Sequence, residues 1–426
     1  MLTITPFPCL LHFKRPAATS RGALRVRQVV FLRAERDGVV GWGECGTVPG
    51  LSRDDRADYV DAVMEICAAV NRGAELVNGN RWAGSVGDRP ERWAGSVGDR
   101  PERWSGSVGD RPERWAGSVG DRPERWSGSV GDRPERWSGS VGDRPERERG
   151  DRPERPLLSD LPSVAFGLEM AWLDLAGGGR QRLFDTPFSR GQASLPTHGL
   201  IWMDTPAGML AQIEGKIASG CRVIKLKVGA LPFEQELALL TELRRRWPPA
   251  DVELRLDANG AWTAEEARER LARLAEFTPT FLEQPIAPGQ PQAMAALCAS
   301  SPVPIALDEE MIHATDPAAL LATIRPQHIV LKPSLLGGLA ACQGWIDAAG
   351  RLGAPCEWWI NSLLESNIGL NAIAQWSSSL GDGRVHGLGT GQLFADNIPS
   401  PLRYERCNLT LPAEAAWDFS RIHAEA

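Results

Sequence analysis

Four charged residues in the second half of this chain are spaced almost evenly, and each closes a short apolar run. Asp257, Glu283, Asp308 and Lys332 follow one another at intervals of 26, 25 and 24 residues. Each interval has room for one β-strand and one amphipathic α-helix, the unit that connects two parallel strands. In a parallel β/α barrel, functional residues gather at the carboxyl ends of successive strands. The spacing therefore predicts a barrel with these four residues around one end.

The apolar runs and the amphipathic segments between them define the expected elements. The predicted fold class is α/β, a (β/α)7β TIM-like barrel. We expect eight strands, at 197–203, 221–227, 252–257, 281–283, 303–308, 328–332, 355–360 and 385–388. We expect helices at 205–218, 233–246, 263–276, 315–323, 339–351 and 366–375. Thr263, followed by Glu265 and Glu266, has the sequence of a helix amino terminus.

The sequence on either side of the barrel predicts further units. The first 80 residues predict strands around a hairpin turn at Asp37-Gly38, followed by a helix over 54–69. A helix at 161–176 is apolar around most of its circumference, which predicts that it is buried. We therefore expect an α+β domain starting at 1–80, a repeat insertion at 81–155, a helical link at 156–195, the barrel at 196–395 and a C-terminal segment at 396–426 that returns to the first domain.

The insertion at 81–155 repeats the pattern Arg-Trp-Ala/Ser-Gly-Ser-Val-Gly-Asp-Arg-Pro-Glu every 11 residues. A packed solenoid needs a continuous apolar stripe. Each unit offers one Trp and one Val among two Gly, one Pro and four charged residues, a composition that favours disorder. A protein partner bound through the tryptophans is the weaker hypothesis. We predict that deleting residues 82–155 leaves catalysis largely intact.

Charge and cysteine content exclude several classes of function. The net charge of −7 argues against a nucleic-acid partner. The eight cysteines form no Cys-x-x-Cys pair and no short spacing suited to zinc, so we expect reduced thiols. No apolar run approaches the length of a membrane span, and the first residues lack a basic region followed by an apolar core. We expect a cytoplasmic protein without a membrane partner.

Two lysines in the second predicted strand are candidates for acid–base chemistry. Residues two apart on a strand share a face, so Lys225 and Lys227 both point into a closed barrel. Repulsion between the two ammonium groups would lower the pKa of one and suit it to proton transfer near neutral pH. The alternative, a pair of solvated surface lysines, conflicts with the apolar run that precedes them.

The carboxylates at the ends of the next three strands predict a metal site. Asp257, Glu283 and Asp308 would surround one point, and such a cluster requires a cation. Carboxylate oxygens with open coordination positions suit Mg²⁺, with Mn²⁺ as the alternative ion. Any one of the three alone could instead cap a helix, and Asp308 is the easiest to explain in that way. Lys332 is predicted to lie across the barrel mouth from Lys227.

The order of these motifs resembles the enolase superfamily in its muconate-lactonizing subgroup, over residues 160–400. The motifs are Lys225-x-Lys227, Asp257-x-Asn259, Glu283-Gln-Pro, Asp308-Glu309 and Lys332-Pro. More closely, the chain resembles the family of o-succinylbenzoate synthases. Residues 362–370 and 386–394 carry this closer resemblance, together with Gly41-Trp-Gly-Glu44, which is similar to a motif of the family's α+β capping domain.

The resemblance implies a syn dehydration of a small molecule, a cyclohexadiene hydroxy acid with a succinyl chain, to aromatic 2-succinylbenzoate. It implies that Lys227 removes the proton α to the ring carboxylate and then protonates the leaving hydroxide. Mg²⁺ on Asp257, Glu283 and Asp308 would bind that carboxylate, the pattern known for this superfamily. Lys332 would face the other side of the ring as a cation. The implied pathways are menaquinone and phylloquinone biosynthesis.

The resemblance also assigns supporting roles to other residues. Lys225 would lower the pKa of Lys227 and contact the carboxylate, while Asn259 and Glu309 would orient ligands or pair with a lysine. The remaining candidates for contact with substrate are Ser362, Ser366, Gly389, Thr390 and Gly391 in the pocket, and Thr19 and Arg21 in a lid. The repeat insertion departs from the family pattern, which has only a short link between the capping domain and the barrel.

Two other functions stay open. Two facing lysines also serve an N-acylamino acid racemase or a dipeptide epimerase of the same superfamily. An epimerase would show Asp-x-Asp at the eighth strand, where this chain has Gly387-Leu-Gly-Thr, which disfavours dipeptides but not acyl amino acids. A catalytically inactive scaffold, with the tryptophan repeats as its binding surface, is the third hypothesis. The catalytic and metal positions all carry competent residues, which argues against the scaffold.

Overall fold

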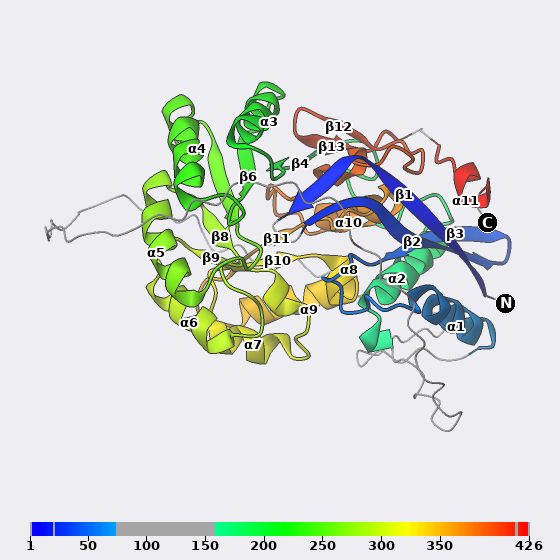
Figure 1. Ribbon diagram of the computed structural model, residues 1–426. Coiled ribbons are helices and arrows are strands. Elements are labelled where there is room, and N and C mark those ends of the chain that lie inside the picture. The colour runs from blue at the N-terminus through cyan, green and yellow to red at the C-terminus, as the bar shows by residue number, and fades with distance from the viewer. Residues whose placement is uncertain (1, 20–21, 74–157, 414–415, 425–426) are drawn as a thin grey trace, which may run out of the picture. The chain divides into compact units, whose positions relative to one another are not determined.

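The structure is a computed structural model that describes residues 2–19, 22–73, 158–413 and 416–424 (Figure 1). Everything described below belongs to one compact unit formed by residues 1–82 and 155–426. The repeat insertion predicted at 81–155, with its expected disorder, lies outside the described residues. Among the described residues, none of the helices combines the length and apolar character that crossing a bilayer requires.

A parallel sheet of seven strands forms the barrel. In spatial order its strands are β5 (Gly199–Ile201), β6 (Val223–Lys227), β7 (Glu253–Asp257), β8 (Phe281–Glu283), β9 (Ile305–Leu307), β10 (His328–Leu331) and β11 (Glu357–Ile360). The eighth predicted strand is reduced to two parallel bridges, from His386 to Thr197 and from Gly387 to Asn361. These bridges connect the segment before β5 to the segment after β11 and close the ring. The predicted fold class is confirmed.

Helices cover the outside of the barrel. They are α3 (Pro206–Ala218), α4 (Phe233–Arg246), α5 (Ala264–Leu274), α6 (Pro291–Ser300), α7 (Pro317–Ile324), α9 (Leu339–Gly350) and α10 (Asn367–Ser379). Figure 1 shows α4 to α7 along one side of the strands. Thr263 caps α5 as predicted, because its hydroxyl accepts from the Glu266 amide while the Glu266 carboxylate accepts from the Thr263 amide. The sequence prediction missed α6 and the short α8 (Pro333–Leu336).

The two faces of the barrel sheet bury different side chains. One face joins leucines and isoleucines of the strands to the helices in a large apolar core, which includes Leu254, Leu282 and Ile329. The alternate positions form a separate cluster of Phe281, Ala306, Val330 and Trp359 inside the barrel. Because side chains alternate along a strand, residues two positions further on also point inward. Those residues include Glu283, Asp308 and Lys332, which places the predicted site in the barrel interior.

The capping domain is an antiparallel sheet covered by two helices. Its strands are β1 (Thr3–Thr19), β2 (Gly22–Arg36) and β3 (Val39–Gly46), and its helices are α1 (Tyr59–Asn71) and α2 (Pro162–Ala176). The predicted turn Asp37-Gly38 has positive φ at both residues, as a two-residue hairpin requires. A Cβ atom on Gly43 of β3 would lie 1.9 Å from the carbonyl oxygen of Gly167 in α2. Only glycine allows this close packing, and α2 is buried along most of its length as expected.

The C-terminal segment contacts both the barrel and the capping domain. β12 (Arg403–Glu405) and β13 (Asn408–Thr410) form a small sheet with β4 (Leu195–Pro196), which directly precedes the barrel. Further along, α11 (Ser420–Ala424) packs on β1. The ring of Phe419 stacks on Trp42 of β3, with ring centroids 4.8 Å apart. The short helices η2 (Leu158–Asp160), η3 (Ala275–Phe277), η4 (Glu309–Met311) and η5 (Gly389–Gln392) complete the described elements.

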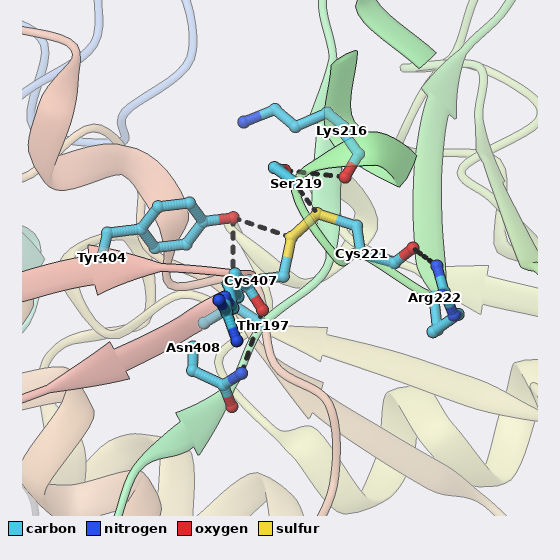
Figure 2. The surroundings of a disulfide bond; sticks show 9 residues. Thr197, Lys216, Ser219, Cys221, Arg222, Tyr404, Cys407 and Asn408 are labelled. Carbon is cyan, nitrogen blue, oxygen red and sulfur yellow. Dashed lines mark hydrogen bonds between the residues drawn. A yellow bond between two sulfur atoms is a disulfide. The ribbon is translucent and has the colours of Figure 1, made fainter. Parts of the chain in front are cut away.

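The expectation that all cysteines are reduced is wrong for one pair. A disulfide joins Cys221, just before β6, to Cys407, between β12 and β13, across 186 residues of sequence (Figure 2). The Cα atoms of the two residues are 5.1 Å apart, a separation that a disulfide spans. The Tyr404 hydroxyl lies 3.1 Å from the sulfur of Cys407 (Figure 2). The bond fastens the C-terminal hairpin to the amino-terminal end of the barrel strands, opposite the predicted site.

Candidate active site

Six charged residues inside the barrel form one buried network, which we call the charged network. Its members are Lys225, Lys227, Asp257, Glu283, Asp308 and Lys332, and all six are buried. The strand register brings them together, because Lys227 pairs with Asp257 and Asp257 pairs with Glu283 across β6, β7 and β8. The sequence prediction placed these residues around one end of the barrel, and the structure collects them there.

Lysine ammonium groups alternate with carboxylates in the charged network. The Lys225 nitrogen lies 2.9 Å from Asp257 Oδ2 and 2.6 Å from Glu283 Oε2. The Lys227 nitrogen lies 3.0 Å from the same Asp257 oxygen. Lys332 forms an ion pair with Asp308, and its nitrogen is 4.0 Å from Glu283 Oε1. Each buried carboxylate therefore has an ammonium group beside it, as the burial of charge requires.

The pKa values of the two lysines of β6 shift in opposite directions. Burial opposes the charge on Lys225, but Asp257 and Glu283 outweigh burial and raise its pKa. Burial lowers the pKa of Lys227, and the positive charge of Lys225 adds to this shift against the attraction of Asp257. The lowered pKa of one lysine of the pair agrees in direction with the sequence prediction. Its largest cause is burial, however, rather than repulsion between the two lysines.

Glu283 is the least well compensated carboxylate of the charged network. Burial and the neighbouring charge of Asp257 raise the pKa of Glu283 to about 8. Both of its oxygens are buried without a hydrogen-bond donor, because the Lys225 nitrogen approaches outside hydrogen-bond geometry. Asp257 behaves differently. Burial raises its pKa, but the attraction of Lys225 and Lys227 is stronger and leaves it well below its usual range.

The three carboxylates suit a divalent cation in donor type and in unmet charge. Across the part of the chain that the structure describes, no three His, Cys, Asp or Glu side chains stand together as a ligand set. Asp257, Glu283 and Asp308 face lysines instead. Hard oxygen donors are nevertheless the ligands that Mg²⁺ prefers, and Glu283 offers two oxygens that no donor satisfies. The residues therefore fit such an ion.

Asn259 connects the charged network to Glu309. Its side-chain oxygen accepts a 2.6 Å hydrogen bond from the Lys227 nitrogen, and its side-chain nitrogen donates to Glu309 Oε1 at 3.0 Å. The Asn259 backbone amide donates to Asp257 Oδ1 at 3.0 Å. Asn259 has a φ of 48°, in the left-handed region that asparagine tolerates better than most residues. This conformation lets one residue bond to both a lysine and a carboxylate, and its predicted supporting role in the reaction stays a prediction.

Gln284 is a site residue that the sequence prediction left out. It follows Glu283 directly and is completely buried. Its side-chain oxygen accepts from the backbone amides of Asp308 and Glu310, both at 3.2 Å, and its side-chain nitrogen donates to the Ile286 carbonyl at 2.9 Å. Gln284 therefore fixes the end of β9 that carries Asp308. The Glu-Gln-Pro motif contained the signal, because a polar residue after an inward-facing acid needs buried partners.

The predicted pocket residues separate into two groups. Ser362 donates to the Gly387 carbonyl at 3.1 Å and bonds to Thr390 of η5, which also contains Gly389 and Gly391. Those residues lie together after β11 and the closing bridges. Ser366 is instead fully buried at the amino terminus of α10, where its hydroxyl donates to Glu44 of the capping domain. Ser366 joins two domains and does not line an open pocket.

The predicted lid residues lie where β1 turns into β2. Thr19 ends β1, with Gly22 as its partner in β2, but its side chain is outside the described set. Arg21 also lies outside the described residues. The lid role of both residues therefore stays a prediction.

Comparison with known proteins identifies the family. Residues 208–415 match the family model of the enolase C-terminal domain-like proteins, and residues 3–82 match the N-terminal domain of mandelate racemase and muconate lactonizing enzyme. The chain is 39% identical to the o-succinylbenzoate synthase of Desulfotalea psychrophila over 394 residues, which cover 92% of this chain and 94% of that protein. The chain belongs to the o-succinylbenzoate synthases of the enolase superfamily.

Solved structures agree with this membership. The crystal structure of MenC from Desulfotalea psychrophila matches with a TM-score of 0.69 and 33% identity, covering 96% of this chain and 99% of that one. The L-Ala-D/L-Glu epimerase from Bacillus subtilis matches with a TM-score of 0.67, over 97% of this chain and 96% of that one. Its identity is only 18%, so it shares the fold and carries no inference about substrate. The predicted superfamily is confirmed.

Proposed function

We propose that this o-succinylbenzoate synthase family member dehydrates 2-succinyl-6-hydroxy-2,4-cyclohexadiene-1-carboxylate to 2-succinylbenzoate, in menaquinone or phylloquinone biosynthesis. The observation that carries the proposal is that the pKa values of two buried lysines in one network shift in opposite directions. Burial lowers the pKa of Lys227, whereas the attraction of Asp308 outweighs burial and raises the pKa of Lys332. The surroundings of Lys227 therefore shift it toward the neutral amine that a base requires, and the surroundings of Lys332 stabilise its charged form.

Lys227 carries both proton transfers of the reaction. Its neutral amine takes the proton α to the ring carboxylate, and the electron pair of the broken C–H bond moves toward that carboxylate. The pair then returns to form the new ring double bond as the C–O bond breaks, and the Lys227 ammonium protonates the departing hydroxide to give water. The side-chain oxygen of Asn259, 2.6 Å from the Lys227 nitrogen, orients that nitrogen. Because one group serves both steps, hydrogen and hydroxide leave from the same face of the ring.

Lys332 provides a fixed positive charge in the same network. Its ion pair with Asp308, together with the more distant Glu283, keeps the ammonium group charged. A buried cation stabilises negative charge that develops on a substrate placed beside it. Lys332 therefore complements Lys227 without exchanging a proton itself. Lys225, held between Asp257 and Glu283, adds its positive charge to the burial that lowers the pKa of Lys227, and it provides a donor for the substrate carboxylate.

Asp257, Glu283 and Asp308 would hold Mg²⁺, or Mn²⁺ in its place. When bound, the ion acts as a Lewis acid that stabilises charge on the substrate carboxylate. A dicarboxylate substrate adds two negative charges to a site that already holds three carboxyl groups, and a divalent cation offsets this charge. The buried oxygens of Glu283, which lack hydrogen-bond donors, are the strongest support for this assignment.

The test is an assay of the full-length protein with Mg²⁺ and the cyclohexadiene substrate, followed by ultraviolet absorbance. We expect aromatisation, its loss in the presence of a chelator, and recovery when Mg²⁺ or Mn²⁺ is added in excess. A parallel sample with an N-succinyl amino acid, followed by polarimetry, tests the racemase alternative. Racemisation without aromatisation would overturn the proposal in favour of the racemase. A folded protein with no activity in either assay would overturn it in favour of the scaffold.

A further inference from the structure

Two charged residues of the capping domain are buried against a barrel loop. Arg27 of β2 and Glu44 of β3 are each only 2% exposed, and they form an ion pair with a separation of 3.6 Å. Their remaining partners include the segment after β11, which we call the β11 loop (361–366). Burying an ion pair costs desolvation energy, and an apolar pair of similar volume often stabilises an interface between domains equally well. The choice of charged residues here therefore needs a specific explanation.

Glu44 occupies the amino terminus of α10. Its carboxylate accepts from the Ser366 backbone amide at 2.9 Å and from the Ser366 hydroxyl at 2.5 Å. It also accepts from the Gly369 amide at 2.9 Å. The first amides of a helix have no partner within the helix, and a negative charge is favoured beside them. Glu44 thus supplies from another domain an anion at the start of α10, beside the Ser366 hydroxyl, which itself accepts from the Ile368 amide at 3.1 Å.

Arg27 holds the middle of the β11 loop. Its guanidinium donates to the Leu364 carbonyl and, at 3.2 Å, to the Gly46 carbonyl of β3. Leu364 has a φ of 66°, a left-handed conformation that costs a non-glycine residue roughly 1 to 2 kcal/mol. Such a conformation persists only where its surroundings impose it. The hydrogen bond from Arg27 is one contact that does so.

The β11 loop connects to both sides of the charged network. Glu365 accepts from the Ser334 hydroxyl at 2.6 Å, and Ser334 lies two residues after Lys332. Ser362 bonds to Gly387 and to Thr390 in η5. A shift of the loop would therefore move the groups that follow β10 and those that close the barrel. These positions surround the barrel end where the proposed reaction takes place.

We propose that Glu44 and Arg27 are positioning residues that couple the docked capping domain to the geometry of the active site. They hold the β11 loop, and with it Ser362 and the start of α10, in the conformation that receives substrate. This proposal rests on the proposed function and extends it. Neither residue touches the charged network, so their effect reaches the reaction only through the loop.

The test compares Glu44→Ala and Glu44→Gln in the full-length protein. Glu44→Ala leaves the amides of Ser366 and Gly369 without their acceptor, so we expect KM to rise about 10- to 100-fold while kcat falls less than about 5-fold. Glu44→Gln keeps an acceptor oxygen of similar reach and should recover at least about ten-fold in kcat/KM over Glu44→Ala. A purely structural role would lower the amount of folded enzyme without changing KM.

Asp174 provides the matched control at the same joint. It is fully buried in α2 and accepts from the backbone amides of Trp42 at 2.9 Å and Gln181 at 2.6 Å, and none of its hydrogen bonds within the described residues reaches the β11 loop. We expect Asp174→Asn to lower the melting temperature with KM unchanged. If Asp174→Asn raises KM as much as Glu44→Ala does, the coupling through the loop is refuted.

Amide hydrogen exchange separates this inference from the proposed function. In Glu44→Ala we expect faster exchange over residues 363–369 than in the wild type, and no such change in Asp174→Asn. This readout does not depend on the reaction that the enzyme catalyses. A wild-type enzyme that does not aromatise the substrate defeats the proposed function. An active wild type whose Glu44→Ala variant keeps its KM and its exchange rates defeats the inference.

Discussion

The barrel interior buries charge at two levels, and the two levels solve the problem differently. The charged network at the carboxyl ends of the strands sets three ammonium groups against three carboxylates. Two residues earlier on the strands lies the level that we call the lower layer, made of Arg255, Phe281, Ala306, Val330 and Trp359. Both levels are inside the same sheet and both are shielded from water. The upper level holds ammonium and carboxylate groups in direct contact, with the pKa values of Lys227 and Glu283 shifted toward their neutral forms.

The lower layer satisfies its one guanidinium without a second buried charge. Arg255 lies 4.3 Å over the ring centroid of Trp359 and 5.7 Å over that of Phe281. It donates to the Val385 carbonyl and to Glu253, both at 2.8 Å. A delocalised planar cation stacks well on aromatic faces, so this arrangement is stable with no change of protonation. The comparison indicates that the upper level serves chemistry and the lower level serves stability.

Lys227→Ala should produce the largest effect on the upper level. Removing the only proposed base and acid should lower kcat by at least about 10³-fold. The fold should survive, because Asp257 keeps Lys225 at 2.9 Å as a partner. The measurement is steady-state aromatisation together with circular dichroism. Lys14→Ala, on the exposed part of β1, is the control and should keep full activity. Turnover within ten-fold of the wild type would remove Lys227 from its role.

Most residues of the charged network could be predicted, because their positions depend on the sequence of the strand that carries each of them. Each of its residues ends an apolar run, and the alternation of side chains fixes the face that it occupies. The hairpin at Asp37-Gly38 and the capping box at Thr263 depend on similarly short-range rules, and both appear where predicted. Helix α6 was missed because its sequence, Pro-Gln-Ala-Met-Ala-Ala-Leu-Cys, carries little amphipathic contrast.

The contacts that could not be predicted join residues that are far apart in sequence. The Cys221–Cys407 disulfide spans 186 residues, and nothing near either cysteine identifies its partner. Glu44 reaches Ser366 across 322 residues, so the motif around Glu44 marked a capping domain but not the helix that it caps. The sequence prediction placed Ser366 in the substrate pocket because its long-range partner, Glu44, could not be identified from the sequence. A serine before a helix does not indicate which domain supplies its partner.

Removal of the disulfide should have the second largest effect, at the lower end of the barrel. A double Cys221→Ser/Cys407→Ser variant should lose about 2 to 5 kcal/mol of unfolding free energy, because the bond closes a loop of 186 residues in the unfolded chain. Turnover at 25 °C should stay within two-fold. Urea unfolding with and without a reducing agent provides the measurement. If the unfolding free energy of the wild type is the same with and without the reducing agent, the disulfide does not stabilise this end of the barrel.

Arg255→Leu tests the lower layer directly. The change removes a buried cation from its aromatic partners and leaves the Val385 carbonyl without a donor, so we expect a loss of about 3 kcal/mol in unfolding free energy. Arg255→Lys should recover part of this loss, because it keeps a positive charge and a hydrogen-bond donor. The recovery should be incomplete, because a lysine lacks the planar group that stacks on the aromatic rings. For both variants we expect kcat/KM within about three-fold of the wild type. A ten-fold fall in kcat would show that the lower layer also shapes the reaction.

His328 gives the smallest effect and the sharpest test of protonation at the lower level. Burial lowers its pKa to about 4, and its ring lies against Trp359 with centroids 5.5 Å apart. An unfolded histidine titrates near 6.5, so the unfolded chain takes up a proton first as the pH falls. The contribution of His328 is therefore complete above about pH 6.5 and is lost progressively as the pH falls from about 6.5 to about 4, by up to about 1.4 kcal/mol per pH unit.

His328→Phe keeps an aromatic ring in the stack and removes the titrating group. Its unfolding free energy, measured by urea at intervals from pH 7 to pH 4, should fall less steeply than that of the wild type, and the difference should reach about 3 kcal/mol at pH 4. Activity at pH 7 should not change, because His328 is neutral there and lies below the charged network. Parallel curves for the two proteins would mean that the lower layer accepts a second positive charge beside Arg255. The two levels of the barrel would then differ in composition but not in tolerance of charge.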